Sequence, residues 1–75
     1  LKPHPPLLLS LKTSISQVSR TMASKRADCV LAVGEDNTLA GILTDKDITF
    51  RVIAAGLNPN NTTLEEVMTA HPTSI

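Results

Sequence analysis

The most informative segment of the chain, residues 41–48, reads Gly41-Ile42-Leu43-Thr44-Asp45-Lys46-Asp47-Ile48. An apolar strand runs into a glycine-led turn here, and a helix begins directly afterwards. Thr44 stands at the start of this helix, and Asp47 follows three positions later. Thr-x-x-Asp is the spacing of a capping box, which stabilises a helix by about 1 kcal/mol. The segment therefore predicts a strand-to-helix junction that places a hydroxyl beside a carboxylate.

The rest of the chain alternates between short strands and helices. Residues 29–33 form a continuous apolar run, as expected for a strand buried on both faces. Ile15, Val18 and Met22 recur at helical spacing, which predicts one apolar helix face. A hairpin partner follows the first apolar run after a turn-rich segment. The predicted strands are residues 6–11, 29–33 and 39–43, and the predicted helices are residues 15–25, 44–55 and 64–68.

Helix ends carry their own signals. Ser14 with Gln17, and Thr63 with Glu66, have capping-box spacing at the starts of the first and last predicted helices. Gly56 predicts the end of the middle helix, because glycine readily adopts the left-handed conformation that terminates helices.

Composition limits the classes of function. The 75 residues make one small domain, and Phe50 is its only aromatic residue, so the core must be aliphatic. Seven basic and seven acidic residues cancel, so no global field attracts nucleic acid or an acidic membrane. The shortage of aromatic residues also argues against recognition of bases by stacking.

Cys29 is the only cysteine, which excludes an internal disulfide or a cysteine-based zinc site. Its apolar neighbours predict a buried, unreactive thiol, and the chain is consistent with an intracellular, reducing compartment. Residues 7–9 are three leucines, far fewer than the roughly 20 apolar residues that span a bilayer. We therefore expect a soluble protein.

Residues 41–47 fill every place of the pattern glycine, two aliphatic residues, Thr or Ser, two variable residues and Asp. In this they resemble the cystathionine-beta-synthase (CBS) domain, a small adenosyl-ligand sensor that occurs in pairs. Residues 67–72, Val-Met-Thr-Ala-His-Pro, look like the start of a second repeat. The resemblance implies an α/β (α+β) fold, β-α-β-β-α, with a three-stranded sheet packed against two helices. Residues 1–68 would form one repeat, and residues 69–75 a linker or the start of the next.

The resemblance also implies a binding site. In the family, the hydroxyl and the carboxylate that match Thr44 and Asp47 hydrogen-bond the ribose of AMP, ATP or a related adenosyl ligand. A carboxylate suits this role, because its oxygens accept from two adjacent hydroxyls. The segment 27–29 would flank the adenine, and a basic residue would neutralise phosphate. The predicted ligand-binding residues are Thr44, Asp47, Ala27, Asp28, Cys29 and Arg51, and the expected ligands are AMP, ADP, ATP or S-adenosylmethionine.

Each assignment has a plainer alternative. Thr44 and Asp47 can serve only as a helix cap, and the two roles can coexist. Arg51 lies four residues after Asp47, which predicts an ion pair within the helix. Asp28 can be a solvated loop charge, and Lys46 is expected at the surface.

Metal binding and catalysis find little support. Asp45 and Asp47 are two positions apart and so do not face each other on a helix, and a third ligand is missing nearby. His4 and His71 each adjoin a proline and have no metal-binding partner at a suitable spacing. The sequence contains neither a glycine-rich phosphate loop nor Gly-x-Ser-x-Gly, so we expect no enzyme.

The sequence thus predicts a regulatory module that senses adenosyl nucleotides in a cleft between paired repeats and controls an attached or partner domain. Its partner would be a second repeat in the same chain or in a homodimer. The alternative is an assembly module that dimerises without any ligand. Neither function requires a bound cofactor.

Overall fold

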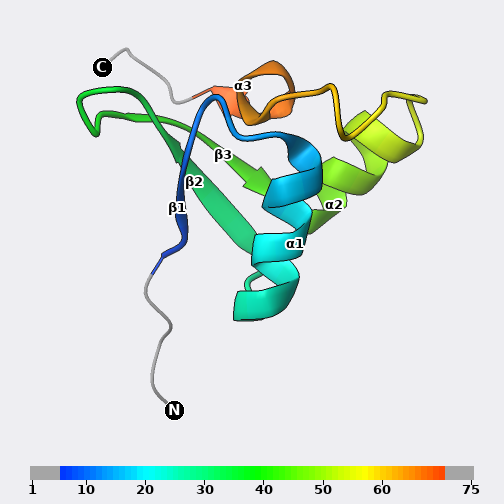
Figure 1. Cartoon of the computed structure of the whole chain (residues 1–75), viewed down its shortest axis with the longest axis horizontal. Helices are drawn as coiled ribbons and strands as arrows, with labels where there is room; N and C mark the ends of the chain where they lie inside the picture. The colour runs from blue at the N-terminus through cyan, green and yellow to red at the C-terminus, as the bar shows by residue number, and fades with distance from the viewer. Residues whose placement is uncertain (1–5, 71–75) are drawn as a thin grey trace.

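The computed structural model describes residues 6–70 (Figure 1). The predicted α/β class is confirmed, and every predicted strand and helix is present. His4 and His71 lie outside the described residues. In chain order the elements are β1 (Leu8–Ser10), α1 (Ile15–Lys25), β2 (Cys29–Val33), β3 (Leu39–Thr44), α2 (Asp45–Ile48), the π-helical segment η1 (Thr49–Ile53), α3 (Leu64–Val67) and β4 (Thr69–Ala70).

The strands form one sheet in the order β1-β2-β3-β4. β1 runs parallel to β2, while β2 with β3 and β3 with β4 are antiparallel. The expected three strands are present, but the sheet has a fourth, because the free edge of β3 pairs with β4. β4 lies at the beginning of residues 69–75, which were predicted to be a linker or the start of a second repeat.

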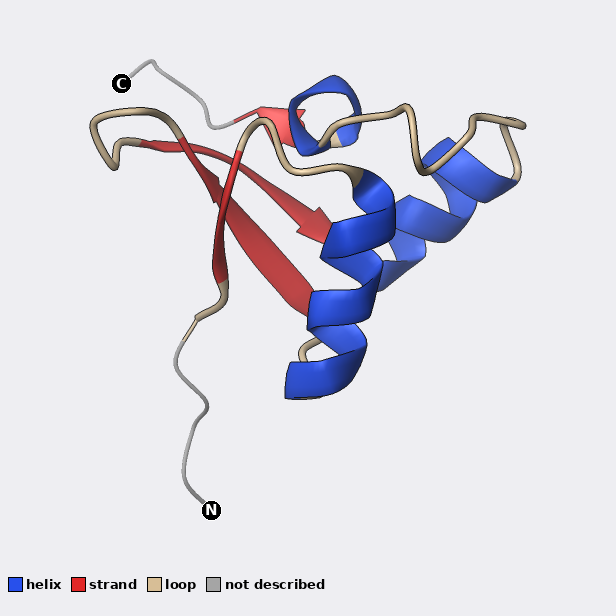
Figure 2. Cartoon of the chain, in the orientation of Figure 1, coloured by secondary structure: helices blue, strands red, loops and turns tan. Residues whose placement is uncertain are grey.

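The core lies between the sheet and the helices. α1 buries Ile15, Val18 and Met22, as its spacing predicts. They pack in one cluster with buried side chains of the sheet and of the C-terminal half. Figure 2 shows the helices gathered on one side of the strands. The remaining members of this aliphatic cluster are Val30, Ala32, Leu43, Val52, Leu64 and Val67.

The prediction that β2 is buried on both faces is wrong. Val30 and Ala32 are fully buried, whereas Cys29 is exposed and Leu31 is only partly covered. The reason is that successive side chains of a strand point to opposite faces, and the helices cover only one of them. The buried thiol expected at Cys29 is therefore an exposed one.

Leu8, Leu31, Ile42 and Thr69 lie side by side across the four strands, and they mark the second face of the sheet. Leu8 is 55% exposed and Ile42 is 39% exposed. We call the face that carries Leu8, Leu31 and Ile42 the open sheet face. In the part of the chain that the structure describes, the helices lie on the opposite side of the sheet (Figure 2).

Gly41 belongs to β3 and does not form the expected turn. It is buried, and its backbone φ is not positive. A side chain is excluded here because Met68 and the backbone of Thr69 pass directly over its Cα. Glycine thus permits a close approach between two segments of backbone.

The helix ends mostly follow the predictions. The Ser14 hydroxyl accepts a hydrogen bond from the backbone N–H of Gln17 at 3.2 Å. The Gln17 side chain turns along the helix to Thr21 and Arg20, so the predicted capping box is only half formed. Gly56 has a φ of 78° and ends the middle helix as expected.

Two backbone carbonyls of the loop before α3 accept hydrogen bonds from the first turn of α1. The backbone N–H of Ile15 donates to the Thr62 carbonyl at 2.8 Å, and that of Ser16 donates to the Pro59 carbonyl at 3.0 Å. N–H groups in the first turn of a helix have no partner within it, so these carbonyls satisfy them. At the start of α3, Glu66 accepts from the backbone N–H of Thr63 at 2.8 Å and from its hydroxyl at 3.0 Å.

Candidate functional site

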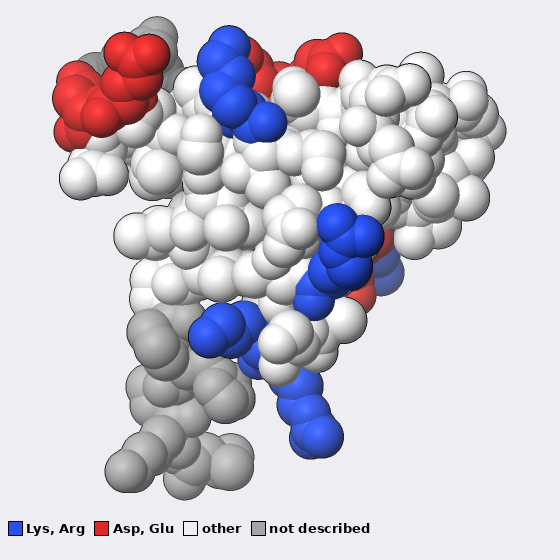
Figure 3. All heavy atoms as spheres, in the orientation of Figure 1, with Lys and Arg blue, Asp and Glu red and all other residues white. Residues whose placement is uncertain are grey.

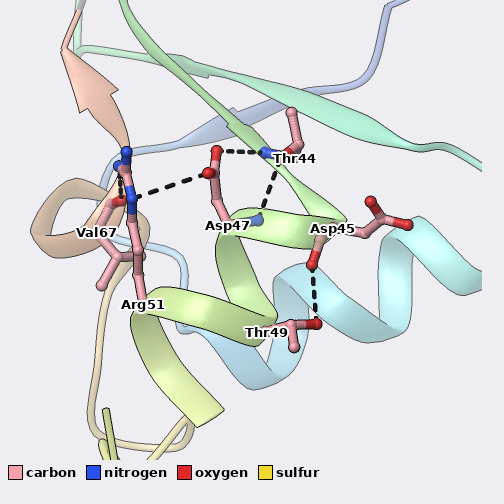
Figure 4. A network of polar contacts seen from close by, with 6 residues as sticks. All are labelled: Thr44, Asp45, Asp47, Thr49, Arg51 and Val67. Atoms are coloured by element: carbon pink, nitrogen blue, oxygen red, sulfur yellow. Dashed lines mark hydrogen bonds and ion pairs between the residues drawn. The ribbon is translucent and has the colours of Figure 1, made fainter. Parts of the chain in front are cut away.

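Thr44 and Asp47 bond reciprocally where β3 passes into α2. The backbone N–H of Asp47 donates to the Thr44 hydroxyl oxygen at 3.2 Å, and the Asp47 carboxylate accepts from the backbone N–H of Thr44 at 3.2 Å. Figure 4 shows both bonds. The predicted capping box is therefore confirmed. It holds the hydroxyl and the carboxylate side by side in a partly buried position.

Arg51 joins this pair to the C-terminal part of the chain. Its Nε lies 3.8 Å from Asp47 Oδ1, which confirms the ion pair expected from their spacing. Its Nη1 donates to the carbonyl oxygen of Val67 at 2.8 Å. The sequence carries no signal for this second contact, because the two residues are 16 positions apart.

Asp45 points away from Asp47 (Figure 4). The two carboxylates therefore do not form the considered Asp-x-Asp metal site. Residues 6–70 contain no group of three His, Cys, Asp or Glu side chains that could hold a metal ion. Asp45 instead lines a cavity of about 260 Å³ between α1 and α2, together with Ser19, Met22, Ala23, Ala27 and Ile48.

The segment 27–29, which the resemblance placed beside the adenine, lies against the start of α2. The carbonyl of Asp28 accepts a hydrogen bond from the backbone N–H of Asp45 at 3.0 Å. Cys29 is paired with Thr44 across β2 and β3. Ala27 lies on the other side, in the cavity beside Asp45. The structure thus brings Thr44 together with Asp47 and Cys29 at one corner of the sheet, and Asp47 together with Arg51. Ala27 contributes to the cavity between α1 and α2.

This corner adjoins the open sheet face. Thr44 is two residues from Ile42 in β3 and therefore shares its face of the sheet. A polar pair thus borders an apolar surface formed by Leu8, Leu31 and Ile42.

The sequence profile of the CBS domain matches residues 3–54. The chain belongs to the CBS domain family. The motif of residues 41–47, on which the resemblance rested, lies within the matched region, so the family assignment is confirmed.

The relatives are much longer proteins. The CBS domain-containing protein CBSCBSPB2 of Arabidopsis thaliana is 44% identical over 66 residues, which are 88% of this chain and 12% of that protein. Another curated relative is matched over 10% of its length. The chain thus spans about a tenth of the length of these two curated relatives.

Solved structures share the fold. A cystathionine beta-synthase domain protein fused to a Zn-ribbon-like domain is 27% identical, with a TM-score of 0.85, and the match covers 95% of this chain and all of that chain. The CBS domain protein PAE2072 from Pyrobaculum aerophilum, complexed with AMP, is 20% identical, with a TM-score of 0.79. The match covers 92% of this chain and 53% of PAE2072.

Side chains of both charges lie on the surface of this CBS domain. On the face shown in Figure 3, basic side chains are spread out and acidic ones lie mainly along the upper edge, with uncharged surface between them. This agrees with the balanced composition. Among residues 6–70, no helix has the length and apolar character needed to cross a membrane.

Proposed function

We propose that this CBS domain is a regulatory module that binds an adenosyl nucleotide beside Thr44 and Asp47. The observation that carries the proposal is the position of this polar pair at the border of the open sheet face. A second repeat on that face would enclose the ligand between the two repeats. The module would then act on an attached or partner domain and catalyse no reaction itself.

The chemistry of the pair suits a ribose. The Asp47 carboxylate accepts one hydrogen bond from the Thr44 backbone and has further lone pairs for the two ribose hydroxyls. The Thr44 hydroxyl accepts from the Asp47 backbone, and its proton remains available to a ligand oxygen. Both side chains can therefore cap the helix and contact a ligand at the same time.

AMP is the first ligand to test, because PAE2072, which shares the fold, was solved in complex with AMP. ADP, ATP and S-adenosylmethionine are the other adenosyl candidates. Regulation would follow if the ligand binds one arrangement of the paired repeats better than another, since only such a difference shifts an equilibrium.

A ligand-free assembly module is the second candidate. It is favoured by the reciprocal bonds of Thr44 and Asp47 and by the pairing of Asp47 with Arg51, which give both side chains partners without any ligand. In this case the open sheet face alone would be functional.

Thermal unfolding with each adenosyl compound separates the two. A ligand that binds only the folded pair stabilises it by about 2.7 kcal/mol at a hundredfold excess over Kd. For a domain of this size the melting temperature should rise by roughly 10 °C or more. No rise with any adenosyl compound at millimolar concentration, in protein shown to be folded and paired, would favour the assembly module.

A further inference from the structure

The last strand, β4, has little to hold it in the sheet. It consists of Thr69 and Ala70, both exposed, and it pairs only with β3. Such a short edge strand has a low free energy of local opening. Contacts just before it therefore decide how firmly it docks.

A polar contact just before β4 comes from the candidate site. Arg51 donates from Nη1 to the carbonyl of Val67, the last residue of α3, at 2.8 Å. The same guanidinium places its Nε 3.8 Å from the Asp47 carboxylate. Figure 4 shows Arg51 between these two groups. A continuous chain of contacts thus runs from Thr44 through Asp47 and Arg51 to the start of β4.

Asp47 orients Arg51 in this chain. The arginine side chain is 44% exposed, so packing alone leaves it considerable freedom. The carboxylate is 26% exposed and is fixed by the Thr44 backbone, so it offers a stationary negative charge to the guanidinium. Removing that charge should reduce the fraction of time in which Arg51 reaches Val67.

We infer that Arg51 is a positioning residue that couples the charge around Asp47 to the docking of β4, so that a phosphorylated ligand at this site loosens residues 67–70. The ligand part of this inference rests on the proposed function, whereas the contact chain does not. A phosphate bears a full charge and forms bidentate bonds with guanidinium, so it competes well against a neutral carbonyl. Adenosine has no phosphate, so the hydrogen bond from Arg51 to the Val67 carbonyl should persist when adenosine binds.

The first test uses amide hydrogen exchange of the ligand-free chain. Arg51→Gln and Asp47→Asn should each speed exchange of the amides of residues 68–70 by roughly fivefold to tenfold, as expected for loss of one hydrogen bond of ordinary strength. Amides of α1 and β2 should keep their rates. Arg20→Gln is the matched control, because Arg20 is an exposed arginine whose side chain, among the described residues, bonds only to Gln17 within α1.

The double variant tests whether Asp47 acts through Arg51. In the Arg51→Gln background, Asp47→Asn should cause no further increase in exchange at residues 68–70, because the link is already broken. Independent, additive increases from the two substitutions would overturn the coupling. If the amides of residues 68–70 exchange at the same rate in Arg51→Gln as in Arg20→Gln, the coupling is refuted as well.

The ligand test compares AMP with adenosine at concentrations that saturate binding in a calorimetric titration. AMP should speed exchange at residues 68–70, and adenosine should not. AMP that binds without changing these rates would refute the inference while leaving the proposed function intact. If AMP does not bind, the proposed function fails for AMP, and the variants alone decide whether Asp47 controls β4.

Discussion

Gly41 lies so close to Met68 that a Cβ atom added to Gly41 would stand 2.6 Å from the Met68 sulfur and 2.6 Å from the Thr69 carbonyl oxygen. The side chain of Met68 can move, but the carbonyl belongs to the backbone of a paired strand. Gly41, the first residue of the motif, therefore has no room for a side chain beside Met68 and Thr69. The motif of residues 41–47 thus contacts Met68 and Thr69 through Gly41, and it also contains Thr44 and Asp47 of the candidate site.

Gly41→Ala should destabilise the domain by about 1–3 kcal/mol, as expected for an overpacked buried site. Gly34→Ala is the matched control. A Cβ at Gly34 would meet its nearest atoms at 3.8 Å, so this change should cost less than about 0.5 kcal/mol. Chemical denaturation of both variants checks the prediction, and equal stabilities would contradict it.

Asp47→Asn should weaken AMP binding by about 1.5–3 kcal/mol, because the amide loses the charge that strengthens bonds to ribose hydroxyls. Asp45→Asn removes the same charge two residues earlier, where the side chain points away from Asp47, and should leave affinity nearly unchanged. Calorimetric titration measures both. If Asp47→Asn lowers the melting temperature but AMP affinity stays at the wild-type value, Asp47 is a helix cap and no ligand residue.

Ile42→Lys should prevent pairing through the open sheet face. Ile42 lies between Leu31 and Thr69 on this face, so a lysine there would bury its charge against a partner repeat. Phe50→Lys is the control, because Phe50 is 68% exposed on η1, outside the sheet. Sedimentation velocity should show a wild-type dimer, a monomeric Ile42→Lys and a dimeric Phe50→Lys.

Cys29 offers a second readout of the same pairing. It is exposed and lies across from Thr44. Alkylation by iodoacetamide should be slow in the wild-type pair and fast in Ile42→Lys. Rapid alkylation of a dimeric wild-type protein would place the dimer contact elsewhere.

Glu66 should make α3 sensitive to acid. Hydrogen bonds from the backbone N–H and the hydroxyl of Thr63 hold the pKa of the Glu66 carboxyl below its usual value. A pKa lowered by folding means that the stabilisation is complete above the unfolded-state pKa and is lost as the pH falls through the folded-state pKa. The loss should therefore occur in the acidic range, below the ordinary pKa of glutamate.

Thermal melts of wild type and Glu66→Gln between pH 7 and pH 3 test this. Wild type should be the more stable at neutral pH, and the difference should shrink as the pH falls. Glu35→Gln changes an exposed carboxylate in the β2–β3 turn and serves as the control. A difference between wild type and Glu66→Gln that stays constant across the range would contradict the prediction.

Local order was largely predictable from the sequence. The bounds of α1, the Thr44–Asp47 cap and the helix end at Gly56 all depend on residues within a few positions of each other. Helical periodicity, capping and backbone conformation act over that range, so the sequence alone was sufficient. The same holds for the ion pair of Asp47 with Arg51.

Tertiary structure alone decided the features that join distant segments. The exposure of Cys29 depends on which face of β2 the helices cover, and the apolar run itself does not show this. The close approach of Met68 to Gly41 and the bond from Arg51 to Val67 accompany the pairing of β4 with β3, and each joins residues many positions apart. Contacts between residues many positions apart arise from packing, which local patterns do not encode. The sequence therefore determined the cap at the candidate site, and the packed chain determined its connection to β4.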